Sequence, residues 1–144
     1  KQLATEIINE LSGLLKSNQK VDYKFDGEDF VYTDKQMIRN IFINLISNAI
    51  KFSSENKNIN VEVSNNNAII SILVRDRGIG IPKEEQQYLF GRFYRAKNAI
   101  NIQGTGLGLS IVAKYIEEMK GVIEFESELN IGTTFKIQIP IKKT

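Results

Sequence analysis

The sequence contains no cysteine and no histidine. The absence of cysteine excludes disulfides and thiolate metal sites, and the absence of histidine excludes Ser-His and Cys-His nucleophile pairs and the usual zinc sites. No apolar run approaches the roughly 18 residues of a membrane span, and no signal-peptide pattern opens the chain. A net charge of only +2 gives no electrostatic reason to expect nucleic-acid binding. We therefore expect a soluble, intracellular chain, cut from a longer protein because it begins at Lys1 without a methionine.

What is present is ordinary in bulk: 144 residues, 42% hydrophobic and 25% charged, suffice for one domain with a two-layer core. The period of the apolar residues predicts helices over 3–15, 34–52, 82–89 (a short one) and 105–119. It predicts strands over 21–25, 30–32, 59–63, 68–74, 122–126 and 135–139. Residues 91–103 show no regular period and are predicted to form a mobile loop. In chain order, hairpins outnumber βαβ units. We therefore predict a single α+β domain over residues 1–144, a two-layer α/β sandwich whose mixed, mostly antiparallel sheet is covered on one face by helices.

The predicted helix over 34–52 carries an unusual polar stripe. At roughly 100° per residue, four polar side chains fall on a stripe about 80° wide beside a broad apolar arc: Asn40, Asn44, Asn48 and Lys51. Asparagine competes with a helix for backbone hydrogen bonds, so three on one face need a reason. Carboxamide oxygens are neutral ligands suited to Mg²⁺ beside phosphates, and the lysine can reach a phosphate. The alternative is a solvated face in an asparagine-rich chain.

A strand that ends at Asp76 runs into a turn containing Gly78, Gly80 and Ile81, which Pro82 closes. A buried carboxylate can accept a hydrogen bond from an exocyclic amine such as adenine N6. Glycines would let the backbone pass close to a planar ring. The alternative is an ordinary turn between a strand and a helix.

A second glycine segment, Gly104-Thr105-Gly106-Leu107-Gly108-Leu109, opens the helix predicted over 105–119. Free backbone N–H groups and the helix dipole make such a start a natural phosphate site, whereas the alternative is a flexible hinge. The spacing does not fit a Rossmann fingerprint, and the sequence has no P-loop and no eukaryotic protein-kinase signature. Arg95, beside the predicted mobile loop, can either swing onto a γ-phosphate or remain an exposed arginine.

Taken in order, these segments resemble the N box, first glycine box, F box and second glycine box of the catalytic and ATP-binding domain of bacterial two-component sensor histidine kinases. The matching stretches are residues 44–52, 76–82, 90–95 and 104–109, and residues 132–135 resemble the closing strand of that domain. The resemblance covers nearly the whole chain. It implies the Bergerat fold, an α/β sandwich that agrees with the α+β prediction.

The resemblance also implies a role for each matching residue. Asn48 would hold Mg²⁺, with Asn44 beside it near the phosphates, while Lys51 touches phosphate and Phe52 packs on the base or ribose. Asp76 would bind adenine N6, helped by Thr133 and a water molecule. The two glycine segments would line the nucleotide through residues that include Gly78, Gly80, Ile81, Gly104, Thr105, Gly106, Leu107, Gly108 and Leu109. Arg95 would meet the γ-phosphate, and residues 96–103 would form a lid over ATP.

The resemblance implies a domain that binds ATP and Mg²⁺ and donates the γ-phosphoryl group to a histidine. Because this chain has no histidine, the acceptor would lie on a separate dimerisation domain of the same kinase, which then serves a response regulator. The whole protein would be a membrane-anchored homodimer, and this cytoplasmic domain a monomer that binds no nucleic acid. Asn130 replaces a glycine common in relatives, which the left-handed conformation of asparagine permits.

Three other readings remain open. A hydrolytic relative on the same fold, such as the ATPase domain of DNA gyrase, carries a glutamate one helical turn before its Mg²⁺-binding asparagine. That position is Asn44 here, which cannot act as a general base. An anti-sigma serine kinase fits the F box poorly. A scaffolding domain that has lost ATP binding would keep the fold without the nucleotide.

Overall fold

The computed structural model describes residues 2–28, 34–53, 56–66, 68–88 and 108–141. Along the chain its elements are α1 (Gln2–Glu10), the 3₁₀ helix η1 (Leu11–Leu14), β1 (Lys20–Gly27), α2 (Lys35–Phe52), β2 (Asn58–Asn65), β3 (Ile69–Arg75), the 3₁₀ helix η2 (Lys83–Tyr88), α3 (Gly108–Glu118), β4 (Val122–Glu128) and β5 (Gly132–Pro140). The strand predicted over 30–32 and the loop over 91–103 lie outside the described residues.

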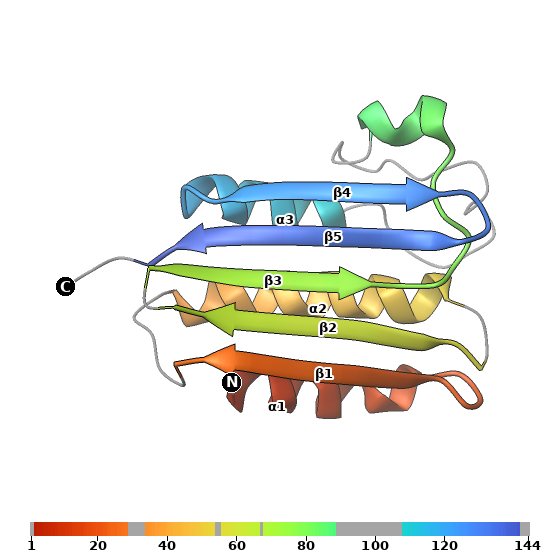
Figure 1. Ribbon diagram of the computed structural model, residues 1–144, viewed down its shortest axis with the longest axis horizontal. Helices are drawn as coiled ribbons and strands as arrows, with labels where there is room; N and C mark the ends of the chain where they lie inside the picture. The colour runs from red at the N-terminus through yellow and green to blue at the C-terminus, as the bar shows by residue number, and fades with distance from the viewer. Residues whose placement is uncertain (1, 29–33, 54–55, 67, 89–107, 142–144) are drawn as a thin grey trace.

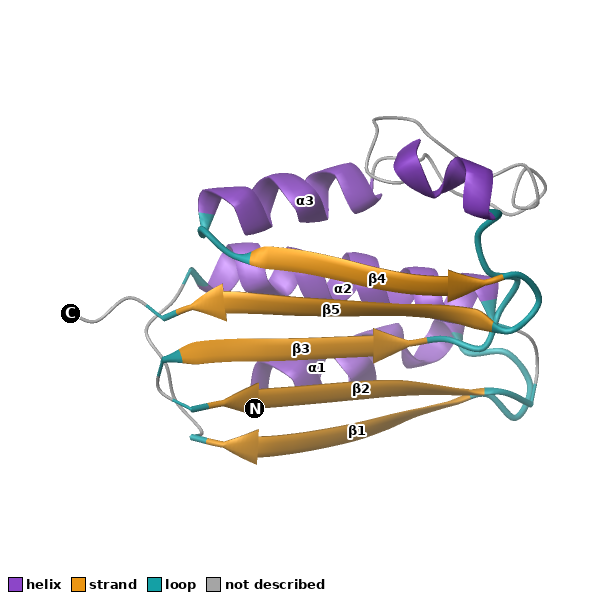
Figure 2. Ribbon diagram, turned by 45° about the horizontal axis from the view of Figure 1, so that its top comes forward, coloured by secondary structure: helices purple, strands orange, loops and turns teal. Residues whose placement is uncertain are grey.

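The strands form one sheet in the order β1-β2-β3-β5-β4. Three neighbouring pairs are antiparallel, and β1 runs parallel to β2 because α2 connects them as a crossover. All three α-helices lie on the same face of the sheet, with α2 between α1 and α3 (Figures 1 and 2). The predicted α+β sandwich with a mixed, mostly antiparallel sheet is therefore confirmed.

The core lies between α2 and the sheet, where the apolar periods of the helix and the strands meet. The buried side chains of α2 are Ile38, Ile41, Phe42, Leu45, Ile46, Ala49 and Ile50. They pack against the inward residues of the central strands: Ile59, Val61, Val63, Ile70, Ile72, Val74, Phe135, Ile137 and Ile139. Burying one such aliphatic side chain is worth about 1.5–3 kcal/mol, so this single layer supplies most of the driving force for folding.

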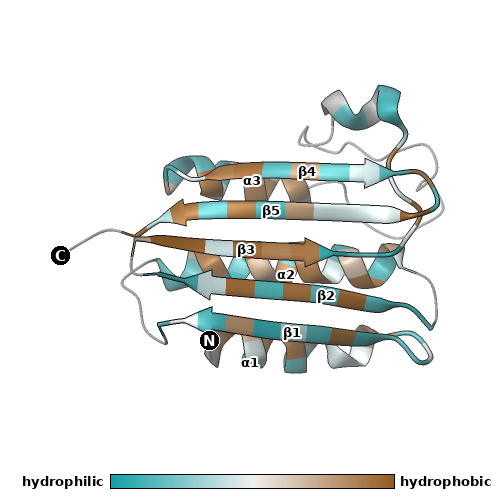
Figure 3. Ribbon diagram, viewed as in Figure 1, coloured by the Kyte–Doolittle hydropathy of each residue, from teal (hydrophilic) through white to brown (hydrophobic). Residues whose placement is uncertain are grey.

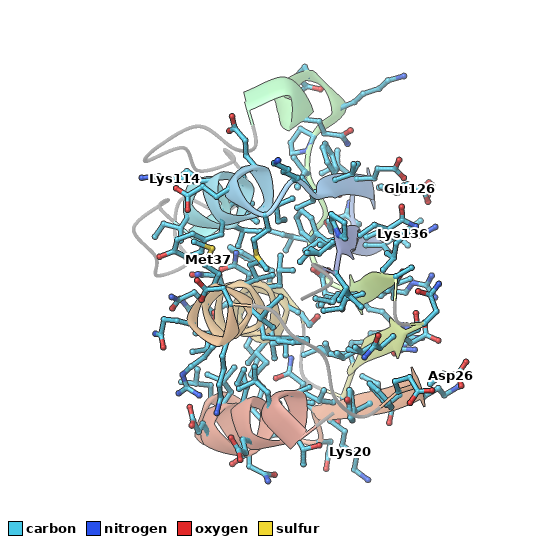
Figure 4. The ribbon with its side chains drawn as sticks, turned by 90° about the vertical axis from the view of Figure 1, so that its left-hand side faces the viewer. Lys20, Asp26, Met37, Lys114, Glu126 and Lys136 are labelled. Atoms are coloured by element: carbon cyan, nitrogen blue, oxygen red, sulfur yellow. The ribbon has the colours of Figure 1, made fainter. Side chains whose placement is uncertain are left out.

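The other face of the sheet carries the alternate, mostly polar residues of each strand. Figure 3 shows hydrophilic and hydrophobic residues alternating along β1, β2 and β5. Asp26, Glu126 and Lys136 project from the side of the sheet opposite to the helices (Figure 4). This alternation is typical of a sheet with one buried and one solvated face.

The helix ends refine the predictions. Asp34 caps α2, because its Oδ1 accepts a hydrogen bond from Met37 N at 3.0 Å. The first helix stops at Glu10, earlier than predicted, and continues as η1, in which Ser12 and Gly13 weaken the α-helix. No described helix is long and apolar enough to cross a membrane.

Candidate functional site

Most of the described residues singled out from the sequence gather at one end of the molecule. The C-terminal end of α2, the C-terminal end of β3 and the turn between β4 and β5 all lie on the right in Figure 1. The start of α3 lies on the same side (Figure 2). Segments far apart in the sequence thus meet at the end of the sheet beyond Arg75, where β3 gives way to the first glycine segment.

The asparagine stripe survives as a half-buried face of α2. Asn40, Asn44, Asn48 and Lys51 are all partly exposed, between the buried core side of the helix and solvent. Asn44 Nδ2 donates to Asn40 O at 2.8 Å, which holds the amide against its own helix and leaves its Oδ1 as an available acceptor. Among the described residues, nothing hydrogen-bonds the Asn48 side chain. Neither carboxamide oxygen therefore has a hydrogen-bond partner within the described part of the chain.

The C-terminal end of α2 is hydrogen-bonded to the first glycine segment, residues 76–82. Ser53 is completely buried and pairs with Gly78 in an isolated β-bridge. Its Oγ accepts a hydrogen bond from Arg77 N at 3.2 Å, and Phe52 O accepts one from Ile79 N at 3.3 Å. These contacts hold the last turn of α2, with Lys51 and Phe52, beside the glycine segment.

Asp76 is a buried carboxylate at the centre of this region, with 8% of its surface exposed. Its Oδ1 accepts hydrogen bonds from Gly78 N and from Thr133 N, each at 3.1 Å. Burial disfavours the ionised form and raises the pKa of Asp76 to about 6, although the two backbone donors pull it the other way. Among the described residues, Oδ2 accepts no hydrogen bond, so the carboxylate can still take a donor from a ligand.

The two glycines after Asp76 lie so close to the backbone of other segments that no side chain would fit there. A Cβ on Gly78 would lie 2.0 Å from Phe52 O, and one on Gly80, whose φ is +71°, would lie 2.2 Å from Glu128 O. The sequence suggested that these glycines admit a planar ring, whereas the structure shows α2 and the β4–β5 turn filling that space. Contact of Gly78, Gly80 and Ile81 with a nucleotide remains a prediction.

Ser127 is a residue of this region that the sequence analysis missed. Its hydroxyl lies 2.8 Å from Thr133 Oγ1, accepts from Ile81 N at 2.8 Å and lies 3.3 Å from Gly132 O. It therefore ties the glycine segment to β5, where Thr133 is buried beside Asp76. A signal was present, because Ser127 continues the inward row of Ile123 and Phe125 in β4, where an apolar residue is expected.

The β4–β5 turn confirms the expectation for Asn130, which adopts the left-handed conformation with φ of +63°. Its N–H donates to Ile79 O at 2.8 Å, so the turn too is held against the glycine segment.

Several predicted site residues lie outside the described residues. They are Arg95, the lid over 96–103, and Gly104, Thr105, Gly106 and Leu107. Gly108 and Leu109 begin α3, as a glycine-rich helix start predicts. Within the described part of the chain, no group of three or more His, Cys, Asp or Glu side chains is placed to hold a metal ion.

A family model described as "Histidine kinase-, DNA gyrase B-, and HSP90-like ATPase" matches residues 33–143. The sensor protein RprX of Bacteroides fragilis is 35% identical over 148 residues, covering 99% of this chain and 28% of RprX. The signal transduction histidine-protein kinase ArlS of Staphylococcus aureus is 42% identical over 126 residues, covering 81% of this chain and 27% of ArlS. The chain thus spans less than a third of either relative.

Among solved structures, the nucleotide-free catalytic domain of the histidine kinase ThkA is similar, with a TM-score of 0.73 and 29% sequence identity. The match covers 96% of this chain and 92% of the ThkA domain. The boxes quoted from the sequence and the sheet described above therefore agree with these matches. The chain belongs to the family of histidine kinase-, DNA gyrase B- and HSP90-like ATPases, and within it to the ATP-binding catalytic domains of sensor histidine kinases.

Proposed function

We propose that this chain is a single domain, residues 1–144, that binds ATP with Mg²⁺ and donates the γ-phosphoryl group to a histidine on a separate dimerisation domain. The observation that carries the proposal is the buried Asp76 carboxylate, whose Oδ2 accepts no hydrogen bond from a described residue and which is tied through Gly78 and Ser53 to the end of the asparagine helix. One polar acceptor and one carboxamide face thus belong to the same connected region. In the proposed complex the carboxylate would bind the adenine base, and the carboxamide face would bind Mg²⁺ and the phosphates.

The base would be recognised by Asp76. An ionised carboxylate accepts a hydrogen bond from adenine N6, and burial makes that bond selective because a ligand without the donor leaves the charge unpaired. Thr133 is buried next to it and assists through its hydroxyl, which Ser127 holds at 2.8 Å. Phe52, half-buried at the end of α2, would pack on the base or ribose.

The phosphates would lie along the stripe of α2. Asn48, with no hydrogen bond to another described residue, fits a Mg²⁺ ligand, and the free Oδ1 of Asn44 lies one helical turn away. A bound Mg²⁺ would neutralise phosphate charge. Lys51 would contact a phosphate, the segment from Gly104 to Leu109 would donate backbone N–H groups, and Arg95 would meet the γ-phosphate. Catalysis would then be mainly positioning and charge neutralisation.

The protein partners are inferred from two facts: the chain has no histidine to accept the phosphoryl group, and it belongs to the sensor histidine kinase family. The acceptor would be supplied by a dimerisation domain of the same kinase, and a response regulator would take the phosphoryl group from it. The full-length protein would be a homodimer anchored in the cell membrane, with this domain in the cytoplasm and monomeric by itself. Nucleic acid is not expected as a partner, since the net charge is +2.

Transfer is favoured over hydrolysis by Asn44. Its amide cannot take a proton from water at neutral pH, and its Nδ2 is already engaged with Asn40 O at 2.8 Å. A scaffold without nucleotide is disfavoured by the burial of Asp76, because a buried carboxylate oxygen left unpaired among the described residues lowers stability and adds no contact to the fold.

Titration calorimetry with Mg²⁺ and a non-hydrolysable ATP analogue tests the proposal. Asn48→Ala and Asp76→Ala should each weaken binding at least about tenfold while circular dichroism stays unchanged. Asn9→Ala, an exposed asparagine on α1, is the matched control and should bind like the wild type. Repeating the titration in EDTA should weaken the wild type but not Asn48→Ala. Absence of binding by the wild-type chain would favour the scaffold.

A second assay separates binding from transfer. The domain is mixed with ATP and a histidine-bearing helix pair of a sensor kinase, and phosphohistidine is measured. Arg95→Ala should slow transfer more than it weakens ATP binding, because the arginine acts on charge that develops at the γ-phosphate. Equal losses in both assays would contradict that role.

A further inference from the structure

The last turn of α2 carries Lys51 and Phe52, and its carbonyls need partners from elsewhere, because the last four carbonyls of a helix have none within it. All four are paired here: Ala49 O with Ser53 N (3.1 Å), Ile50 O with Gln19 Nε2 (3.2 Å), Lys51 O with Lys16 Nζ (2.7 Å) and Phe52 O with Ile79 N (3.3 Å). Two of these donors come from the segment between η1 and β1, which lies far away in the sequence.

Lys16 and Gln19 form one unit, called here the helix clamp. Lys16 N donates to Gln19 Oε1 at 2.9 Å, and Gln19 N donates to Lys16 O at 3.0 Å. Gln19 is 4% exposed, so its amide has a fixed orientation. Both side chains also reach Ser53 O, Lys16 Nζ at 2.5 Å and Gln19 Nε2 at 3.4 Å. A cation at this place also faces the negative end of the helix dipole.

The clamp is continuous with the first glycine segment. Ser53, held by the clamp at its carbonyl, pairs with Gly78 and accepts Arg77 N through its hydroxyl. Asp76 Oδ1 in turn accepts from Gly78 N. One chain of hydrogen bonds therefore runs from Lys16 through the end of α2 to the carboxylate proposed to read adenine.

We propose that Lys16 is a positioning residue for nucleotide binding, which acts through the end of α2 rather than by touching the nucleotide. This inference rests on the proposed function. Without the ammonium group, the carbonyls of Lys51 and Ser53 lose a charge-assisted donor. The last turn then frays, and the side chains of Lys51 and Phe52 lose the geometry that a bound nucleotide requires.

The test compares three variants in titration calorimetry with Mg²⁺ and a non-hydrolysable ATP analogue. Lys16→Met keeps the aliphatic stem and removes the donor, and it should bind about tenfold more weakly than the wild type. Lys16→Arg restores a cationic donor and should recover affinity to within about twofold. Lys20→Met, at an exposed lysine that begins β1, is the matched control and should bind like the wild type.

Affinities are compared well below the melting temperature of every variant, so that lost stability alone leaves the dissociation constant unchanged. Wild-type affinity in Lys16→Met, or equal weakening in Lys20→Met, overturns the inference and leaves the proposed function intact. If Lys16→Met does not fold, Lys16→Gln takes its place with the same expectations. If the wild type binds no nucleotide, the proposed function fails, and amide exchange decides the clamp: unchanged protection of the Ser53 and Ile79 amides in Lys16→Met overturns it.

Discussion

The two ends of the sheet differ in how they treat polar side chains. Four of the five buried polar side chains of the described residues lie at the end beyond Arg75: Gln19, Ser53, Asp76 and Thr133. The opposite end has only Asn65, whose Nδ2 bonds Glu28 O at 2.9 Å, and the turn there is closed by Asn66 Oδ1, which accepts from Ala68 N and Ile69 N. Between the two ends the core is wholly apolar.

The two ends differ in the range of their hydrogen bonds: those at the β2–β3 turn are local, whereas those at the end beyond Arg75 join distant segments. In the turn between β2 and β3, Asn66 Oδ1 accepts from backbone N–H groups only two and three residues away, as is usual in a hairpin. At the other end, hydrogen bonds join segments of chain as distant as Gln19 and Thr133 into one connected region. Buried polar groups lower stability unless they are paired, and the hydrogen bonds between these segments supply that pairing at the end where the nucleotide site is proposed.

The largest effect should come from Gly78→Ala. The new Cβ would overlap Phe52 O at 2.0 Å, where backbone meets backbone, so we expect a loss of about 3 kcal/mol or more in the free energy of unfolding, together with loss of nucleotide binding. Gly13→Ala is the control, since a Cβ there meets nothing within 4 Å, and it should leave stability unchanged or slightly raised. Urea denaturation measures both. Equal stability of the two variants would contradict the packing described for α2.

The next effect concerns Asp76→Asn, which keeps an oxygen acceptor for the two backbone donors. The pKa of Asp76 is about 6 in the folded state against 3.8 ordinarily, so the folded state holds the proton more tightly between those values. Its contribution to stability is therefore present below about pH 4 and is lost as pH rises to about 6, by about 3 kcal/mol. The variant should be more stable than the wild type at pH 7 and lose that advantage near pH 4.

Thermal unfolding of the wild type and of Asp76→Asn across this pH range measures the difference in stability between them. The other carboxylates titrate in both proteins, so their contributions cancel in this difference. A constant difference between them would show that Asp76 does not titrate as described. The same ionisation should govern binding, because Oδ1 already accepts two backbone N–H groups and a proton on Oδ2 would make that oxygen a donor, which faces the N6 donor of adenine unfavourably. Affinity for an adenine nucleotide should therefore fall in the wild type as pH drops below about 6.

Ser127→Ala tests how much the link between the glycine segment and β5 contributes. Removal of the hydroxyl leaves Ile81 N and Thr133 Oγ1 without a partner at 2.8 Å, which should lower stability by about 1–2 kcal/mol and weaken nucleotide binding several-fold. Ser71→Ala, on the open face of β3, is the matched control. Chemical denaturation and calorimetry give the two numbers. Weakened stability with unchanged affinity would place Ser127 outside the site.

The smallest effect should come from Asn66→Ala at the opposite end. Loss of the two hydrogen bonds that Asn66 Oδ1 accepts from the turn should lower stability by about 1 kcal/mol, with no change in nucleotide affinity. Denaturation and titration on the same preparation check this. A clear loss of affinity would show that the two ends of the sheet are coupled, and the contrast between them would disappear.

The sequence determined the class of fold and most of its elements, because apolar periods of 3.6 and 2 residues are local properties of the chain. It also placed Asp76 at the end of a buried strand and three asparagines on one face of a helix. It could not decide that β1 and β2 run parallel, since strand pairing depends on the crossover through α2.

Only the tertiary structure showed that Gly78 and Gly80 pack against the backbone of other segments, and which residues support the proposed site. Ser127, Lys16 and Gln19 look unremarkable along the chain, because the hydrogen bonds that tie them to the site reach residues 46, 35 and 31 positions away. Hydrogen bonds across such separations form only after the apolar layer has brought α2 onto the sheet. Local pattern thus specified the elements and the candidate ligand groups, whereas long-range packing set the geometry and protonation of Asp76.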